Sequence, residues 1–191
     1  MQTPREASDE SLLAAHRDGD AGAFEVLFRR YERPLHRHLW RMLGERAAAE
    51  DLVIETFQRL HAHRGDLRPG APVRPWLYTI ANNLARNRLR RERLARWLPL
   101  RAVDRERTAP DPGGRLGSAA EVQRRVAAAL AALPERQREA CSLRLAGELS
   151  IEEIASVTGA SIGTVKSRLF YGQGRLRDLL ADLAPDEEDD R

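Results

Sequence analysis

The sequence predicts an all-α protein of two small helical domains joined by a flexible linker, and three observations support this. Apolar residues recur at helical spacing from Leu12 onward, whereas almost no segment alternates with the period of a strand. The stretch from Pro99 to Gly117 contains three prolines and three glycines and has no sustained apolar period, as is typical of a linker. At 191 residues, the chain is long enough for one large or two small cores.

The first domain, residues 8–97, is predicted to be a helical bundle. One apolar stripe runs from Phe24 to Leu43, between a helix-capping Asp20 and a helix-ending Gly44. A second stripe covers residues 52–60. A third begins at Trp76, after a glycine- and proline-rich loop predicted over residues 65–75. Three such faces can bury one another as a compact bundle.

The second domain, residues 118–183, is predicted to contain four helices, separated from the first domain by the linker at 98–117. Ser118 and Glu121 have the spacing of a capping box. The apolar face of the helix that follows is formed by Val122, Val126, Ala129, Leu130 and Leu133. Pro134 ends this helix and starts the next one, which Gly147 is expected to break. Residues 184–191 are predicted to be a disordered acidic tail.

The last two predicted helices have the spacing of a helix-turn-helix. Ser150 and Glu153 form a capping box, Gly159 can end that helix in a left-handed turn, and Ser161 can cap the next. The second helix turns hydrogen-bonding, cationic and flat apolar groups outward: Thr164, Lys166, Ser167, Arg168, Phe170 and Tyr171. This mixture suits phosphates and base edges in the major groove of duplex DNA. The alternative is an amphipathic hairpin with a solvated charged face.

A second candidate nucleic-acid surface covers residues 82–97, where six arginines stand against one acid. Trp76 and Tyr78 precede this segment, and aromatic faces beside a cationic track are suited to stacking single-stranded bases. Asn83 and Asn87 are four residues apart, so they share a helix face and could bind base edges. The alternative is a solvated helix face with Trp76 in the core.

Several function classes are disfavoured. No apolar run approaches the roughly 18 residues that span a bilayer, and the first ten residues lack the features of a signal peptide, so a cytoplasmic protein is expected. Cys141 is the only cysteine, which excludes an internal disulfide and predicts a buried apolar side chain. A metal enzyme using histidines would need His36 with His38 or His61 with His63, but residues two apart on a helix point away from each other. No catalytic cluster is visible, and we expect neither enzyme activity, metal nor cofactor.

The chain resembles the bacterial extracytoplasmic-function sigma factors, small promoter-recognition subunits of RNA polymerase. The resemblance extends from Leu12 to Leu180 and rests on four segments in order. They are GDAGAFEVLFRRY, AEDLVIETF, PWLYTIANNLARNRLRR, and LPERQREACSLRL with LSIEEIASVTGASIGTVKSRL. The resemblance implies that the first domain is sigma-two, which docks on the polymerase clamp and grips the melted −10 element. The second would be sigma-four, which reads the −35 element as duplex.

The resemblance also implies roles for individual residues. Asp51, Ile54 and Glu55 would face the polymerase clamp, with Ile54 replacing the glutamine common in the family. The melted −10 strand would meet Trp76, Asn83, Arg86, Asn87, Arg88, Arg90 and Arg91. The −35 duplex would meet the outward residues from Thr164 to Tyr171. Gly172 and Gly174 depart from the arginine-rich run usual in the family, and each glycine is expected to weaken the helix.

The partners implied by the resemblance are core RNA polymerase, promoter DNA as duplex and melted strand, and an anti-sigma factor, with no membrane insertion. The rival reading is a helix-turn-helix regulator that binds duplex DNA without polymerase. That reading explains the C-terminal half and leaves the first domain unassigned.

Overall fold

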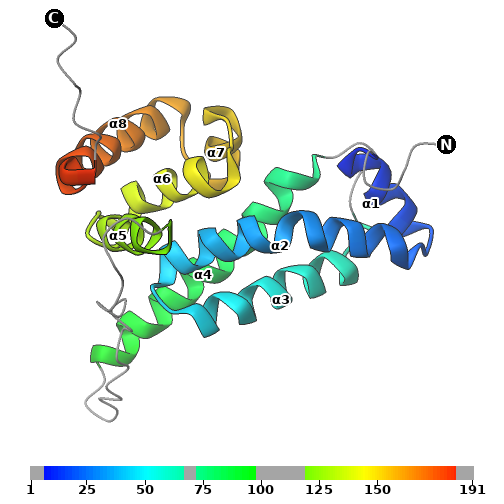
Figure 1. The fold of residues 1–191 in the computed structure, drawn as a ribbon. Coiled ribbons are helices and arrows are strands. Elements are labelled where there is room, and N and C mark those ends of the chain that lie inside the picture. The colour runs from blue at the N-terminus through cyan, green and yellow to red at the C-terminus, as the bar shows by residue number, and fades with distance from the viewer. Residues whose placement is uncertain (1–6, 67–71, 98–118, 184–191) are drawn as a thin grey trace, which may run out of the picture.

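The computed structural model describes residues 7–66, 72–97 and 119–183, and within these ranges the chain is helical, with no strand. The helices in chain order are α1 (Asp9–Arg17), α2 (Ala21–Leu43), α3 (Arg46–Ala62), α4 (Val73–Trp97), α5 (Ala119–Ala131), α6 (Glu135–Gly147), α7 (Ile151–Thr158), α8 (Ile162–Leu179) and the 3-10 helix η1 (Ala181–Leu183). Helices α1–α4 form one domain and α5–α8 the other (Figure 1). The all-α, two-domain prediction is confirmed.

The first domain is organised by α2, which packs against α1, α3 and α4 (Figure 1). The Asp20 carboxylate caps α2 by accepting hydrogen bonds from the backbone N–H groups of Gly22, at 2.7 Å, and Ala23, at 3.2 Å. Gly44 ends the helix with a φ of 76°, a left-handed conformation that favours glycine. The predicted stripes of α2 and α3 face the core, where Leu27, Leu35 and Leu60 are fully buried.

The start of α4 differs from the prediction. The sequence predicted a loop over 65–75, but α4 begins at Val73, so Pro75 lies in its first turn. A proline is tolerated there because the first turn of a helix needs no backbone N–H donor. Residues 67–71 of the predicted loop lie outside the described residues. Val73 is itself buried in the core.

The second domain packs α5, α7 and α8 around α6. Its core includes Leu130, Leu143, Leu149, Ile154 and Val165, each fully buried. Val122, which the sequence placed on the inner face of α5, is 42% exposed, so that part of the prediction is wrong. The predicted linker, the Ser118 cap and the acidic tail lie outside the described residues.

Gly147 marks the end of α6, as predicted, but for a different reason. It is the last residue of the helix, and the left-handed residue is Glu148, with a φ of 51°. The requirement for glycine is steric, because a Cβ at position 147 would lie 2.2 Å from Leu149 Cδ1 and 2.7 Å from Tyr78 Cζ. Tyr78 belongs to the first domain. Gly147 therefore permits close approach between the two domains.

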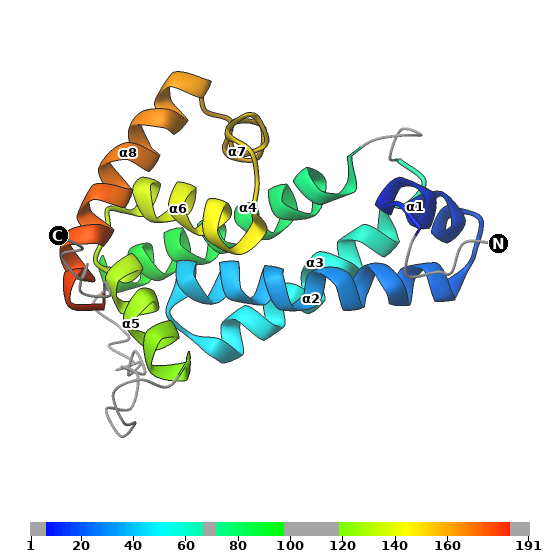
Figure 2. The same ribbon diagram turned by 45° about the horizontal axis from the view of Figure 1, so that its top comes forward.

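The two domains share one continuous hydrophobic core. Helix α6 lies along α2, and α7 lies against α4, in both ribbon views (Figure 2). This packing places one side of α4 next to the second domain.

Candidate nucleic-acid interface

The helix-turn-helix has the capping contacts that the sequence predicted. The Glu153 N–H donates to Ser150 Oγ at 3.1 Å, and the Ser150 N–H donates to Glu153 Oε2 at 2.7 Å, which completes the capping box. Gly159 ends α7 with a φ of 66°. Ser161 Oγ then accepts from the Thr164 N–H at 3.2 Å, which starts α8. Two capped helices joined by a left-handed glycine fix the direction of α8.

The outer face of α8 presents most of the predicted contact residues. Val165, Leu169 and Leu176 are buried beneath it. Thr164, Lys166 and Ser167 are exposed, and Arg168 is half-buried. Phe170 and Tyr171 are 72% and 64% exposed and meet edge to face, with ring centroids 5.4 Å apart. Such a large exposed aromatic pair indicates a binding surface.

The two glycines of α8 have different surroundings. Gly172 is buried where α8 crosses α6, and a Cβ there would lie 2.6 Å from the Sγ of Cys141. A Cβ at Gly174 would meet no atom within 4 Å. The sequence predicted that each of these glycines weakens the helix. The structure shows that Gly172 is required where α8 packs on α6.

The outer face of α4 presents Asn83, Asn87, Arg90 and Arg91, all of which are exposed. Trp76 is half-buried and packs against the core. Two side-chain amides and two guanidinium groups therefore share an exposed helical surface. This surface is the second candidate for nucleic-acid contact.

The remaining two predicted arginines of α4 already hold carboxylates. Arg86 Nε donates to Glu139 Oε1 at 2.5 Å, and Arg88 bonds Glu45 at 3.0 Å and Glu92 at 3.1 Å. Asn82, which the sequence analysis did not select, is fully buried and donates to the same oxygen of Glu139 at 2.8 Å. The signal for Asn82 was its position four residues before Arg86 on one helix face.

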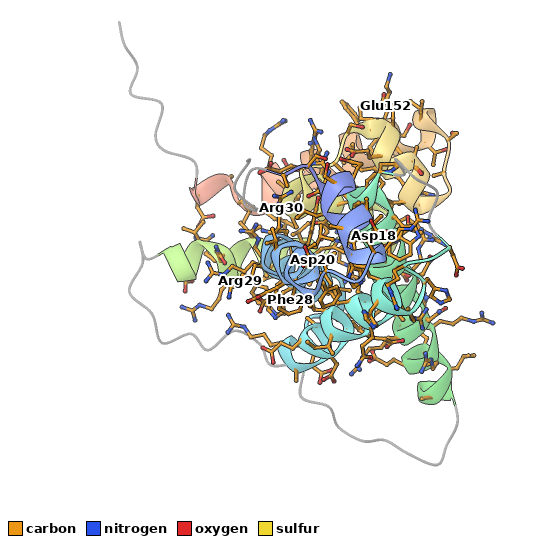
Figure 3. All side chains as sticks on the ribbon, turned by 90° about the vertical axis from the view of Figure 1, so that its right-hand side faces the viewer. Asp18, Asp20, Phe28, Arg29, Arg30 and Glu152 are labelled. Carbon is orange, nitrogen blue, oxygen red and sulfur yellow. The ribbon has the colours of Figure 1, made fainter. Side chains whose placement is uncertain are left out.

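The third predicted site lies on α3. Asp51 is exposed, Ile54 is 49% exposed, and Glu55 bonds Arg59 at 2.7 Å one turn away. Ile54 borders an apolar groove between α2 and α3 that is also lined by Phe24, Phe28, Phe57, Gln58 and His61. Figure 3 shows Phe28 on the side of α2 next to α3, where its ring centroid lies 4.8 Å from that of Phe57.

Comparison with known proteins identifies the family. Sigma-70 region 2 matches residues 27–95, and Sigma-70, region 4 matches residues 123–172. The RNA polymerase sigma factor CarQ of Myxococcus xanthus is 38% identical over 167 residues, 87% of this chain and 94% of CarQ. The ECF RNA polymerase sigma factor SigM of Mycobacterium tuberculosis is 37% identical over 179 residues, 93% of this chain and 87% of SigM. The chain belongs to the extracytoplasmic-function sigma factors.

A solved structure agrees with this assignment. The sigma factor RpoE in complex with the anti-sigma factor NepR from Bartonella quintana has a TM-score of 0.60 and 28% identity, covering 77% of this chain and 89% of RpoE. The present sigma factor is a transcription initiation factor and not an enzyme. The rival reading, a regulator acting without polymerase, left the first domain unassigned, and the match to region 2 assigns it.

Two histidines of the sigma factor, His38 and His63, have different environments. His38 is fully buried and its Nδ1 lies 3.0 Å from Ser142 Oγ, whereas His63 Nδ1 lies 2.9 Å from Asp66 Oδ2 at the surface. Burial lowers the pKa of His38 to about 4, so the ring is neutral at pH 7. In the described ranges, no three His, Cys, Asp or Glu side chains gather where they could hold a metal ion.

Two further sequence predictions concern Cys141 and membrane association. Cys141 is buried as expected, and burial raises the pKa of its thiol to about 11. None of the described helices has the length and apolar character needed to cross a bilayer.

Proposed function

We propose that this sigma factor directs core RNA polymerase to promoters by reading the −35 element as duplex and the −10 element as a melted strand. In this proposal residues 8–97 are the sigma-two domain and residues 118–183 the sigma-four domain, joined by a linker at 98–117 and followed by a tail at 184–191. The observation that carries it is the capped helix-turn-helix whose α8 presents exposed aromatic, hydroxyl and cationic groups.

The −35 duplex would be read by α8 in the major groove. Lys166 and Arg168 supply charge for phosphates, and the hydroxyl groups of Thr164 and Ser167 can bond phosphates or base edges. The exposed rings of Phe170 and Tyr171 offer flat apolar surface for thymine methyl groups.

The melted −10 strand would lie along the outer face of α4. Asn83 and Asn87 can hydrogen-bond the edges of unpaired bases, and Arg90 and Arg91 can neutralise phosphates. Trp76, Arg86 and Arg88 belong to the same proposed site. Arg86 and Arg88 are held by carboxylates in this structure, so they would have to exchange partners.

Core polymerase would dock on α3 through Asp51, Ile54 and Glu55. Ile54 and the neighbouring apolar groove give this surface a hydrophobic centre flanked by two acids. An apolar centre with a polar rim is the usual composition of a protein interface. The replacement of the family's glutamine by Ile54 would shift clamp binding from a hydrogen bond to apolar contact.

An anti-sigma factor is the third proposed partner. RpoE, which resembles this chain over most of its length, was solved with an anti-sigma factor, and this supports the proposal. The proposed location is the cytoplasm, where polymerase and DNA are found.

The experiment that tests the proposal is run-off transcription with core polymerase on fragmented genomic DNA, followed by sequencing of the transcript starts. Protein-dependent starts are expected to share two spaced upstream elements. The double variant K166A/F170A is expected to reduce initiation at those starts about tenfold or more, because a good base contact contributes about 1–3 kcal/mol and loss of a cation weakens phosphate binding. The control D178N alters an exposed acid near the end of α8.

Starts that depend on the protein but share only one upstream element would contradict the two-element reading. Equal losses in K166A/F170A and D178N would contradict the assignment of the −35 contact to the outward face of α8.

A further inference from the structure

We propose that Glu139 of the sigma-four domain occupies the place of a DNA phosphate on the sigma-two domain, so that the two domains latch together and compete internally with the promoter strand. This inference rests on the proposed role of α4 in holding the melted strand. It adds an intramolecular competitor, carried by residues of this chain.

The carboxylate of Glu139 is the centre of the latch. Glu139 lies on α6 and is only 1% exposed. Its Oε1 accepts from Asn82 Nδ2 at 2.8 Å and from Arg86 Nε at 2.5 Å, both on α4. A buried carboxylate is stable only where cations and donors surround it. Two of those groups come from α4, and Arg136 on α6 itself adds a third, with its Nη1 3.5 Å from Oε2. An oxyanion bound by a guanidinium and an amide is also the chemistry of a phosphate contact.

The Arg86 guanidinium is bound to the second domain through two of its nitrogens. Its Nη2 donates to the carbonyl oxygen of Thr158, the last residue of α7, at 3.1 Å. Arg86 therefore binds a carboxylate from α6 and a helix C-terminus from α7. A strand phosphate could take this arginine only if the second domain moved away.

A second ion pair closes the rim of the same contact. Arg74, in the first turn of α4, makes a forked bond to Glu153, with Nη2 2.9 Å from Oε1 and 3.0 Å from Oε2. Glu153 is also the capping-box residue of α7. The start of the helix-turn-helix is thus fastened to the start of α4.

Two further polar contacts join the domains beside these ion pairs. His38 Nδ1 lies 3.0 Å from Ser142 Oγ, and Tyr78 Oη donates to the Ala146 carbonyl at 3.5 Å. Gly147 lets the Tyr78 ring approach α6, as the steric distances above show. The contact surface is therefore built from both domains over several helical turns.

The latch leaves the other DNA-reading surface uncovered. Phe170 and Tyr171 on α8 remain exposed while Asn82 and Arg86 are buried or paired. The free protein should then present its −35 surface and withhold part of its −10 surface. Separation of the domains on polymerase would release Arg86 for the strand.

The test measures binding of a fluorescent 12-nucleotide single strand of mixed sequence by the free full-length protein. E139Q keeps the shape of the side chain and removes its charge. We expect it to bind the strand at least about threefold more tightly. The slope of log affinity against log salt should steepen by about 0.7, the value for one added phosphate contact on a single strand.

Two variants control for charge and for the partner. E152Q removes one negative charge from an exposed position on α7, which Figure 3 shows at the outer edge of the molecule, and should bind as the wild type does. The double variant R86Q/E139Q should lose the gain of E139Q.

Because E139Q alters a buried group, E153Q serves as a second variant. A glutamine keeps the capping box, and a smaller gain is expected from this more exposed pair.

A folded E139Q or E153Q protein that binds the strand with the wild-type affinity and slope would overturn the latch. So would an equal gain in E152Q. Run-off transcription separates this result from the proposed function. Protein-dependent starts without any change in strand binding would reject the latch alone, whereas altered strand binding without any promoter-dependent start would reject the proposed function alone.

Discussion

Gly172 and Gly174 lie two residues apart in α8 but should respond in opposite ways to alanine. G174A places a methyl group in open space and should raise the free energy of unfolding by about 0.5–1 kcal/mol through helix propensity. G172A would press a methyl group against Cys141 and should lower it by about 1–3 kcal/mol. Urea denaturation of both variants measures the difference.

Cys141 provides the control for this pair. In C141A/G172A the Sγ that would lie 2.6 Å from the new Cβ is absent. The double variant should therefore lose less free energy of unfolding than the two single variants lose in total. Strict additivity would show that the contact with Cys141 is not the reason for glycine at 172.

At the scale of single elements, the capping box of α7 should contribute measurably to the helix-turn-helix. S150A removes the acceptor of the Glu153 N–H and should lower the free energy of unfolding by about 1 kcal/mol. S156A is the matched control, since Ser156 is exposed in the middle of the same helix and alanine favours helix. Thermal unfolding of the two variants checks this, and equal stabilities would contradict the role of the cap.

The elements that the sequence predicted well are those set by local contacts. Asp20, Ser150, Gly159 and Ser161 act on residues within one turn, so their spacing along the chain was sufficient to place helix ends. The elements that it missed depend on distant groups. Gly147 was interpreted as a helix breaker because the Tyr78 ring that requires it is 69 positions earlier in the sequence.

The candidate site shows the same limit. The outward residues of α8 follow from helical period alone, and all but the half-buried Arg168 are exposed. The pairing of Arg86 was not predictable, because Glu139 is 53 residues away and lies in the other domain. Nothing in the sequence indicated that a carboxylate of the predicted second domain would pair with an arginine of α4.

At the scale of the whole molecule, the shared core changes how the two domains are expected to act. Two small readers joined by a linker gain affinity when polymerase holds both at the right separation. In the packed arrangement their separation is instead set by the packing of α2 against α6 and of α4 against α7. If the proposed function and the proposed latch are both correct, these interdomain contacts are lost when two promoter elements are bound at once, and they oppose DNA binding by the free protein.

His38 makes this packed arrangement sensitive to acid. Its ring lies in the interdomain contact beside Tyr78 and Ser142, and the charges that act on it are those of Glu139 and Arg41. Burial lowers the folded-state pKa to about 4, below the ordinary value of 6.5. The unfolded chain therefore takes up a proton first as the pH falls. The free energy of unfolding should decrease between pH 7 and pH 5, by about 2 kcal/mol from this residue.

H38Q tests the prediction through the slope with pH rather than through the level of stability, which the substitution also changes. Urea midpoints measured at intervals from pH 7 to pH 5 should fall less steeply in H38Q than in the wild type. H63Q alters a surface histidine next to Asp66. Between pH 7 and pH 5 it should lose the same free energy of unfolding as the wild type, to within about 0.5 kcal/mol, since exposed ion pairs contribute little. If H38Q and the wild type lose stability in parallel over this range, the neutral ring of His38 is not what ties the packed arrangement to pH.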